Sequence, residues 1–178
     1  SPVSRPCVST IFFGTMNTIR PAIDSMMKST ATPRGHILIC SSCLAKVPIP
    51  CYTAYSATKA AQNHIARGLR LELRRFNIYA SSVHPIGTKT ELFDQVKVRS
   101  GVAKLVQHSP DRFMQTSAFV AKKIVKGLRR PKAEIWTGFL GNTIRLGMAI
   151  STFMPGISDR FVAGMVKGLD LFCRQTSG

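Results

Sequence analysis

The run Ile37-Leu38-Ile39-Cys40-Ser41-Ser42, followed a short distance later by Tyr55-Ser56-Ala57-Thr58-Lys59, decides the fold. The first segment is a short apolar run that ends in two hydroxyls, which predicts a buried strand that opens at its end onto a site. The second segment places Tyr55 and Lys59 four residues apart, among small residues that suit a tightly packed helix. Residues at i and i+4 lie on one helical face, so the phenol and the ammonium can share a pocket. A strand-end hydroxyl, a tyrosine and a lysine make a set suited to proton transfer.

Hydrophobic patterning extends outward from this stretch in both directions. It predicts helices over Ile11–Met27, Tyr55–Arg75 and Ser117–Arg129, and strands over His36–Ser42, Asn77–His84 and Ala133–Thr137. Alternating strands and helices indicate an α/β protein in which helices cover a parallel sheet.

The 178 residues are expected to form a single domain spanning residues 1–178. Residues 1–10 are predicted to be an irregular lead-in, and residues 142–178 a helical extension broken at Pro155-Gly156. The segment 86–110 is expected to be a loop with a short helix, in the manner of a lid or substrate loop. The absence of an initial methionine suggests a fragment or a processed chain, and no apolar run is long enough to span a membrane.

The charge is strongly positive, with 25 Lys and Arg against 8 Asp and Glu, a net charge of +17. Such a field favours phosphates, anionic lipid surfaces and other polyanions. The basic residues are scattered and lack zinc-finger or aromatic RNA-binding signatures, so nucleic acid is not the expected partner. Solvated helix faces explain most of them.

The five cysteines form an odd set in a chain too large to need disulfides: Cys7, Cys40, Cys43, Cys51 and Cys173. This favours reduced thiols and an intracellular setting. No spacing predicts a metal site, and Cys40 closes a strand rather than opening a helix, which argues against a redox pair with Cys43.

The chain from about Ile11 to Thr137 resembles the short-chain dehydrogenase/reductase family. Ser42 stands thirteen residues before Tyr55, as the family's catalytic serine does, at the end of a Gly-x-Ile-x-x-x-Ser-Ser strand that starts at Gly35. Residues 85–90 resemble the family's Pro-Gly-x-x-x-Thr loop. The resemblance implies a partial Rossmann-like, doubly wound parallel sheet with flanking helices.

The resemblance also implies an activity: hydride transfer between NAD or NADP and a carbonyl or alcohol substrate, which we extend to lipophilic substrates. It assigns catalytic roles to Ser42, Tyr55 and Lys59. The cofactor contacts that it implies are Tyr55, Lys59, Pro85, Ile86, Thr88 and Thr90.

The proton that accompanies hydride transfer needs a hydroxylic acid/base near the substrate oxygen, and Tyr55 is the candidate. An unperturbed phenol, with a pKa near ~10, supplies too little phenolate at neutral pH. Lowering that value to about 7 requires roughly 4 kcal/mol of preferential phenolate stabilisation. The charge of Lys59 and of the cofactor ring can provide much of this, while Ser42 orients the substrate oxygen.

Three features depart from the family pattern. The family's N-terminal half, with its Thr-Gly-x-x-x-Gly-x-Gly turn, is absent from this sequence. Ile11 stands where the family has a catalytic asparagine, and Ile86 where it has the glycine of the Pro-Gly loop. The sequence therefore predicts the C-terminal catalytic half of a longer enzyme. The alternative is an inactive truncated relative that serves as a basic binding module for anionic membrane or nucleic acid.

Two expectations concern partners. The helices Ile11–Met27 and Tyr55–Arg75 are expected to mediate homo-oligomer formation, because apolar residues cover more of the first helix than one sheet face requires. The segment after Asn142 combines flexible apolar and basic residues, which predicts a lipophilic pocket or contact with a membrane surface. The expected location is intracellular, cytoplasmic or peripheral on a membrane.

Overall fold

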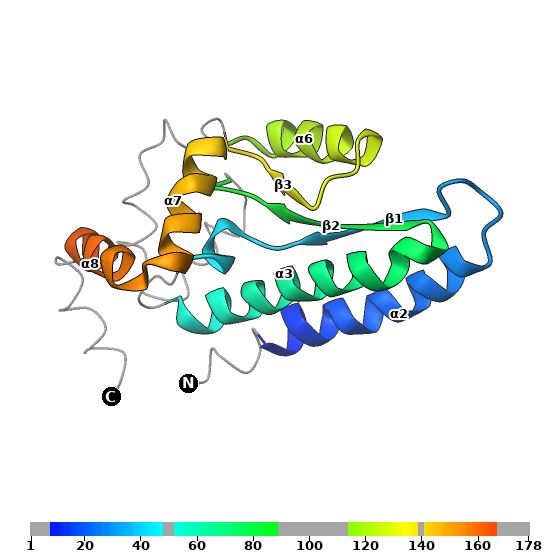
Figure 1. The fold of residues 1–178 in the computed structure, drawn as a ribbon, viewed down its shortest axis with the longest axis horizontal. Helices are drawn as coiled ribbons and strands as arrows, with labels where there is room; N and C mark the ends of the chain where they lie inside the picture. The colour runs from blue at the N-terminus through cyan, green and yellow to red at the C-terminus, as the bar shows by residue number, and fades with distance from the viewer. Residues whose placement is uncertain (1–7, 48–51, 89–113, 139–140, 167–178) are drawn as a thin grey trace.

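The computed structural model describes residues 8–47, 52–88, 114–138 and 141–166, and contains a three-stranded parallel sheet of order β1-β2-β3. The strands are Gly35–Cys40 (β1), Ile78–His84 (β2) and Glu134–Trp136 (β3). The predicted parallel α/β architecture is therefore confirmed. Because all three strands run in the same direction, their carboxyl ends meet at one edge of the sheet (Figure 1).

The helices follow the predicted order, with some shifted ends. They are η1 (Val8–Phe13, a π-helix), α2 (Gly14–Met27), η2 (Cys43–Ala45), α3 (Thr53–Leu73), η3 (Arg74–Phe76), α6 (Ser117–Arg129), α7 (Gly141–Phe153) and α8 (Pro155–Val166). The first helix begins at Val8, inside the stretch predicted to be irregular. The strand predicted to reach Ser42 ends at Cys40, because the Ser41 amide bonds back to the Ile39 carbonyl as well as to the Val83 carbonyl.

The two faces of the sheet are covered by different helices. The Ser82 hydroxyl donates to Asn63 of α3, so this face of β2 lies against α3. Ile135 faces the opposite way, toward α6, where a Cβ on Gly127 would come within 2.3 Å of its Cδ1 atom. Figure 1 shows the same division, with α2 and α3 on one side and α6 on the other. Glycine at position 127 therefore lets α6 approach β3 closely.

The apolar core lies between the sheet and the pair α2 and α3. Its buried members are Ile19, Ile37, Ile39, Ala66, Leu73, Ile78 and Ala80. Ile37 pairs in register with Ala80, so both side chains point to the α3 face. Through Ala66 and Leu73 this core holds α3 against β1 and β2, and so positions the helix that carries Tyr55 and Lys59.

Candidate functional site

The predicted site residues lie at the carboxyl end of the sheet. Ser42 follows β1, Pro85 follows β2, and α3 begins beside them with Tyr55 on its first turn. In Figure 1, α7 stands at this same end of the sheet. In open parallel sheets this edge is the usual position of a binding crevice.

Tyr55 and Lys59 are brought together on α3. The Lys59 Nζ atom lies 5.6 Å from the centroid of the Tyr55 ring. The same ammonium donates to the Cys40 carbonyl at 2.8 Å and to Gln62 Oε1 at 2.9 Å. A further bond, from the Ser41 hydroxyl to the Lys59 carbonyl at 2.7 Å, ties the helix to the end of β1. The positive charge is thus held near the phenol by two separate elements.

Ser42 lies at the start of η2, which packs against α3. Its backbone is extended, and its hydroxyl accepts a hydrogen bond from the Leu44 amide at 3.2 Å. The side chain is only 8% exposed. The Ser42 hydroxyl therefore caps η2, the structural role that a hydroxyl at a helix start most often has. Its orientation of a substrate stays a prediction.

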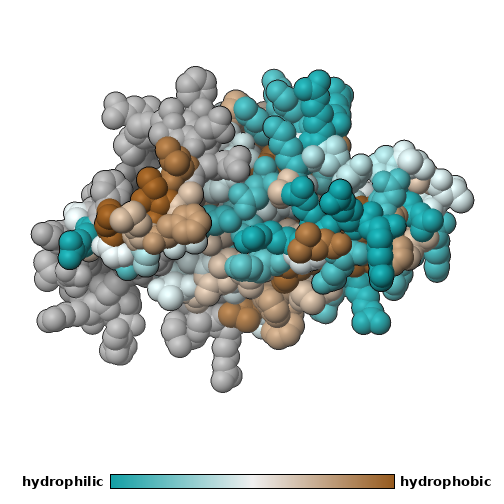
Figure 2. All heavy atoms as spheres, viewed as in Figure 1, coloured by the Kyte–Doolittle hydropathy of each residue, from teal (hydrophilic) through white to brown (hydrophobic). Residues whose placement is uncertain are grey.

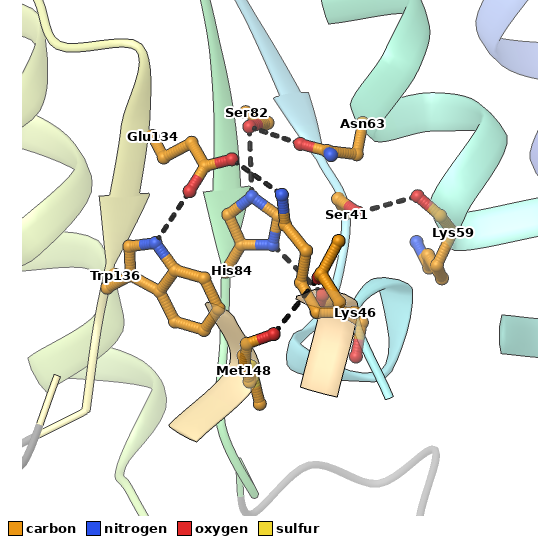
Figure 3. Close-up of polar contacts among 11 residues, drawn as sticks. Ser41, Lys46, Lys59, Asn63, Ser82, His84, Glu134, Trp136 and Met148 are labelled. Carbon is orange, nitrogen blue, oxygen red and sulfur yellow. Dashed lines mark hydrogen bonds and ion pairs between the residues drawn. The ribbon is translucent and has the colours of Figure 1, made fainter. Parts of the chain in front are cut away.

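His84 anchors Ser42 from the end of β2 (Figure 3). Its Nδ1 atom lies 2.9 Å from the Ser42 carbonyl, which can only accept, so Nδ1 carries a proton. Nε2 lies 2.9 Å from the Ser82 hydroxyl, and this hydroxyl donates to Asn63 Oδ1 at 3.0 Å. The fully buried ring also stacks on Trp136 at 4.5 Å between centroids. His84 thus connects all three strands and α3.

An ion pair closes the β3 side of this cluster (Figure 3). Lys46 Nζ donates to Glu134 Oε1 at 2.8 Å, and Trp136 Nε1 donates to Glu134 Oε2 at 3.1 Å. Burial acts to raise the pKa of Glu134, but the bonds from Lys46 and Trp136 and the charge of Lys46 outweigh it. The pKa of this carboxyl therefore lies below its ordinary value, so the carboxylate remains charged at neutral pH.

The loop after β2 contains the predicted cofactor contacts Pro85, Ile86 and Thr88. Gly87 adopts a positive φ of 39°, a conformation that would strain any residue with a side chain. This glycine stands one position later than the glycine of the family's Pro-Gly loop, where this chain has Ile86. The Gln115 amide donates to the Gly87 carbonyl at 2.7 Å. Within the described residues, the buried Thr88 hydroxyl has no hydrogen-bond partner. Thr90 lies outside the described residues.

Sequence reasoning missed several residues that shape this end of the sheet. Gln115 also accepts from the Thr137 hydroxyl at 2.7 Å, and so joins the loop to the end of β3. Gln62 and the Lys46–Glu134 pair were not singled out either. These contacts join residues that are far apart in the chain, so no local sequence pattern predicts them.

The thiols at the end of β1 are not paired. Cys40 and Cys43 are both free, and burial is the largest effect that raises the pKa of the Cys43 thiol. A raised pKa disfavours the reactive thiolate. Among the described residues, no three His, Cys, Asp or Glu side chains are placed to hold a metal ion.

A concave region lies at the amino end of the strands. It is a groove of about 780 Å3 that runs along β2 beside α3 and the segment before β3. Four cationic side chains line it: Arg67, Arg70, Arg74 and Lys132. None of the residues lining it is acidic. The groove exists because β3 pairs only from Ser82 onward, which leaves the first residues of β2 without a neighbour on that side.

Comparison with known proteins gives the family. The model of the family described as "short chain dehydrogenase" matches residues 4–100, more than half of the chain. The chain belongs to the short-chain dehydrogenase family. The family resemblance predicted from Ser42, Tyr55 and Lys59 is therefore confirmed.

Three similar proteins cover most of this chain. "Dehydrogenase/reductase SDR family member 7B" of Xenopus tropicalis is 29% identical over 93% of this chain and 52% of its own length. "3-dehydrosphinganine reductase" of Danio rerio is 24% identical over 90% of this chain and 48% of its own length. A short-chain dehydrogenase from Burkholderia cenocepacia, solved in complex with NADP, is 24% identical with a TM-score of 0.67, over 84% of this chain and 57% of that one. The chain thus spans about half the length of the curated relatives it matches, and its Rossmann-like fold is confirmed.

Proposed function

We propose that this chain carries the proton-transfer site of an NAD- or NADP-dependent oxidoreductase acting on carbonyl or alcohol substrates. The observation that carries the proposal is the Tyr55–Lys59 pair at the carboxyl end of the sheet, with the Lys59 ammonium 5.6 Å from the phenol ring. The nicotinamide cofactor supplies or accepts the hydride when it is bound. The residues of this chain move and hold the proton.

Each residue has a distinct part in this proposal. Tyr55 exchanges a proton with the substrate oxygen as general acid/base. Lys59 favours the phenolate by its charge, since an opposite charge a few ångströms away stabilises the ionised form. The Ser42 hydroxyl orients the substrate oxygen: it accepts from the Leu44 amide, and its own proton, which is directed at Cys43 Sγ at 4.0 Å, can be donated to that oxygen instead.

The cofactor fits the residues that this chain provides. The buried Thr88 hydroxyl, which has no partner among the described residues, is a hydrogen-bonding group that a bound dinucleotide would satisfy. Lys59, Tyr55, Pro85, Ile86 and Thr90 complete the set that would hold it. We propose that the remaining contacts come from a preceding half of a longer enzyme, because this sequence contains no glycine-rich dinucleotide turn.

The substrate class that we propose is lipophilic. Large apolar side chains gather on α7 and α8 next to the site, in the brown patch over α7 in Figure 2. They are Leu146, Ile150, Phe153, Met154 and Ile157, and all are exposed. The similarity to a 3-dehydrosphinganine reductase, whose name indicates a long-chain ketone, supports the same class. A membrane surface is the other occupant that we propose for this patch. Among the described residues, no helix has both the length and the hydrophobicity needed to cross a bilayer.

A second candidate function is binding of a phosphate-bearing surface in the cationic groove. Arg67 and Arg70 lie on one face of α3, and Arg74 begins η3 directly after it; Figure 2 shows hydrophilic atoms over this part of the molecule. The ion pair between Lys46 and Glu134 is the only one among the described residues, so none of these arginines is neutralised by a carboxylate there. Under this second candidate function, the chain is an inactive member of the family that binds an anionic membrane or nucleic acid and catalyses no reaction.

We also propose that the protein self-associates through α2 and α3. Phe13 at the end of η1, Met16 of α2 and Leu71 of α3 are exposed large apolar residues, with Leu71 78% exposed. Burial against a second copy would remove these exposed side chains from water.

Dinucleotide titration tests the proposed function. NADH and NADPH are titrated into this chain and into a version that carries the N-terminal half of a relative. We expect tight binding and turnover of a long-chain ketone only in the longer version. If the longer version binds the cofactor but turns over neither long-chain nor short-chain carbonyls, the proposed reaction is wrong.

A further inference from the structure

A buried glutamine lies between the candidate lysine and the first helix. Gln62 is 6% exposed and sits one helical turn after Lys59 on α3. Its Oε1 atom accepts from Lys59 Nζ at 2.9 Å, and its Nε2 atom donates to the Thr15 hydroxyl at 2.6 Å. Nε2 also lies 3.4 Å from the Ile11 carbonyl, which accepts from the Thr15 hydroxyl at 2.6 Å.

The partners fix the orientation of this amide. An ammonium can only donate, so the atom that meets Lys59 must be the oxygen. The Thr15 hydroxyl uses its proton on the Ile11 carbonyl, so it must accept from Nε2. A flipped amide would lose both bonds while buried, which is unfavourable. Gln62 therefore has one stable arrangement, with its carbonyl toward Lys59.

We propose that Gln62 is a positioning residue that holds the Lys59 ammonium beside Tyr55. The proposal rests on the function proposed above for that pair. A lysine side chain has high rotamer entropy, and each bond that its ammonium makes, such as the one to the Cys40 carbonyl, restricts the conformations that it samples. The bond to Gln62 adds a second restraint from a buried side chain, and Thr15 of α2 holds Gln62 in turn. Ile11 thus contributes through its backbone carbonyl, although its side chain lacks the polar group of the asparagine expected there.

The expected consequence appears in the ionisation of Tyr55. When Lys59 is held near the ring, its charge favours the phenolate. When Gln62 is replaced by leucine, the buried leucine offers no acceptor, so the ammonium turns away toward water. The phenolate then loses part of its stabilisation, and ionisation of Tyr55 moves to higher pH.

The full chain contains three tyrosines, which allows a direct test without turnover. In a Tyr52→Phe, Tyr79→Phe background, the ultraviolet absorbance of the phenolate reports Tyr55 alone. We expect Gln62→Leu to raise the pH midpoint of this titration by roughly half a unit to one unit, the scale of a lost hydrogen bond to a charged group. Thr15→Val, which removes only the far anchor, should raise it less. The double variant should shift no further than Gln62→Leu, because both substitutions act through one chain of contacts.

Ser56→Ala is the matched control. Ser56 is buried on the same helix and adjacent to Tyr55, but its hydroxyl has no hydrogen-bond partner among the described residues. It should leave the midpoint unchanged. Equal shifts in all three variants, or no shift in Gln62→Leu and Thr15→Val, would overturn the proposal. If Gln62→Leu fails to fold, the test rests on the other two variants. A higher Tyr55 midpoint in Thr15→Val than in Ser56→Ala then supports the proposal, and equal midpoints overturn it. A shift in an enzyme that never turns over carbonyls would reject the proposed function but keep the positioning role.

Discussion

The two ends of the sheet handle the same excess of positive charge in different ways. At the carboxyl end, Lys46 is paired with Glu134, and Lys59 is bonded to Cys40 and Gln62. At the amino end, the arginines of α3 and Lys132 face a groove lined by no carboxylate. The first arrangement fixes individual charges at short range, and the second produces an attractive field over a surface.

This difference has a physical signature. Groups held by direct hydrogen bonds and partly removed from water are screened little by salt, whereas exposed charges are screened over about 8–10 Å at physiological ionic strength. Function at the carboxyl end should therefore depend on single atoms and resist salt. Function at the amino end should depend on the number of charges and weaken as salt is added.

The largest effect is expected from Tyr55→Phe in a complete, cofactor-binding enzyme. This change keeps the ring and removes the transferable proton, so turnover should fall by roughly 10²–10⁴-fold while cofactor affinity changes little. Tyr52→Phe is the control, since Tyr52 packs edge-on against Tyr55 at 6.4 Å and carries the same group. Steady-state kinetics measure both. Unchanged turnover in Tyr55→Phe would leave anion binding at the groove as the better candidate.

Lys59→Met should lower turnover roughly 10²-fold and also weaken cofactor binding. It removes the charge that favours the phenolate and a predicted ribose contact, while methionine retains the length of the chain. The pH–rate profile of the native enzyme should contain a group that titrates near neutrality, and this group should move upward in the variant. A fall in turnover with an unmoved profile would contradict the role given to the charge.

Reversal of one groove charge should have a smaller effect, confined to the other end of the sheet. Arg70→Glu should weaken binding to phosphatidylserine vesicles roughly fivefold or more, because each basic residue near such a surface contributes about 1 kcal/mol. Arg20→Glu is the control: it changes the net charge equally on exposed α2, outside the groove. Vesicle flotation at two salt concentrations measures membrane binding of both variants, and a parallel titration with an oligonucleotide measures their binding to nucleic acid. Equal losses in the two variants would show that only the net charge matters.

The carboxyl end was the more predictable of the two regions. The strand end at Ser42 and the i, i+4 relation of Tyr55 and Lys59 are local properties of the chain, and the family resemblance joined the three into one predicted site. The central strand was also predictable: six of the seven residues of β2 are buried, and the sequence that forms it is bounded by Asn77 and Pro85. The catalytic roles of Ser42, Tyr55 and Lys59 stay predictions.

The rest depended on contacts between distant residues. The arginine pattern predicts a solvated helix face, whereas the groove depends on the short β3, which leaves part of β2 without a neighbour. Ile11 was judged by its side chain, whereas its carbonyl is the group that meets Thr15 and Gln62. Backbone groups are the same at every position, so sequence patterns do not indicate which carbonyl a side chain will reach.

The smallest effect is expected at the Lys46–Glu134 pair, where the comparison can be tested through pH. The folded-state pKa of Glu134 lies below its unfolded value, so ionisation of this carboxyl stabilises the fold above the unfolded pKa. That stability is lost as the pH falls through the folded pKa. Glu134→Gln keeps the shape but removes the charge, and leaves one oxygen where Glu134 uses two. At neutral pH the variant should be less stable by about 1 kcal/mol, the upper range for partly exposed pairs.

Denaturant unfolding at neutral pH and at pH about 3, below the ordinary range of glutamate, measures this difference. The gap between native protein and variant should narrow as the pH falls toward 3 and close below the folded pKa of Glu134, and at neutral pH it should persist when salt is added, unlike vesicle binding at the groove. Glu72→Gln, at an exposed carboxylate of α3, should leave stability unchanged at both pH values. If the Glu134 gap disappears with salt while the pH is neutral, the pair behaves as a surface charge. The two ends of the sheet would then differ only in their ratio of positive to negative side chains, and not in how strongly hydrogen bonds and burial shield those charges from salt.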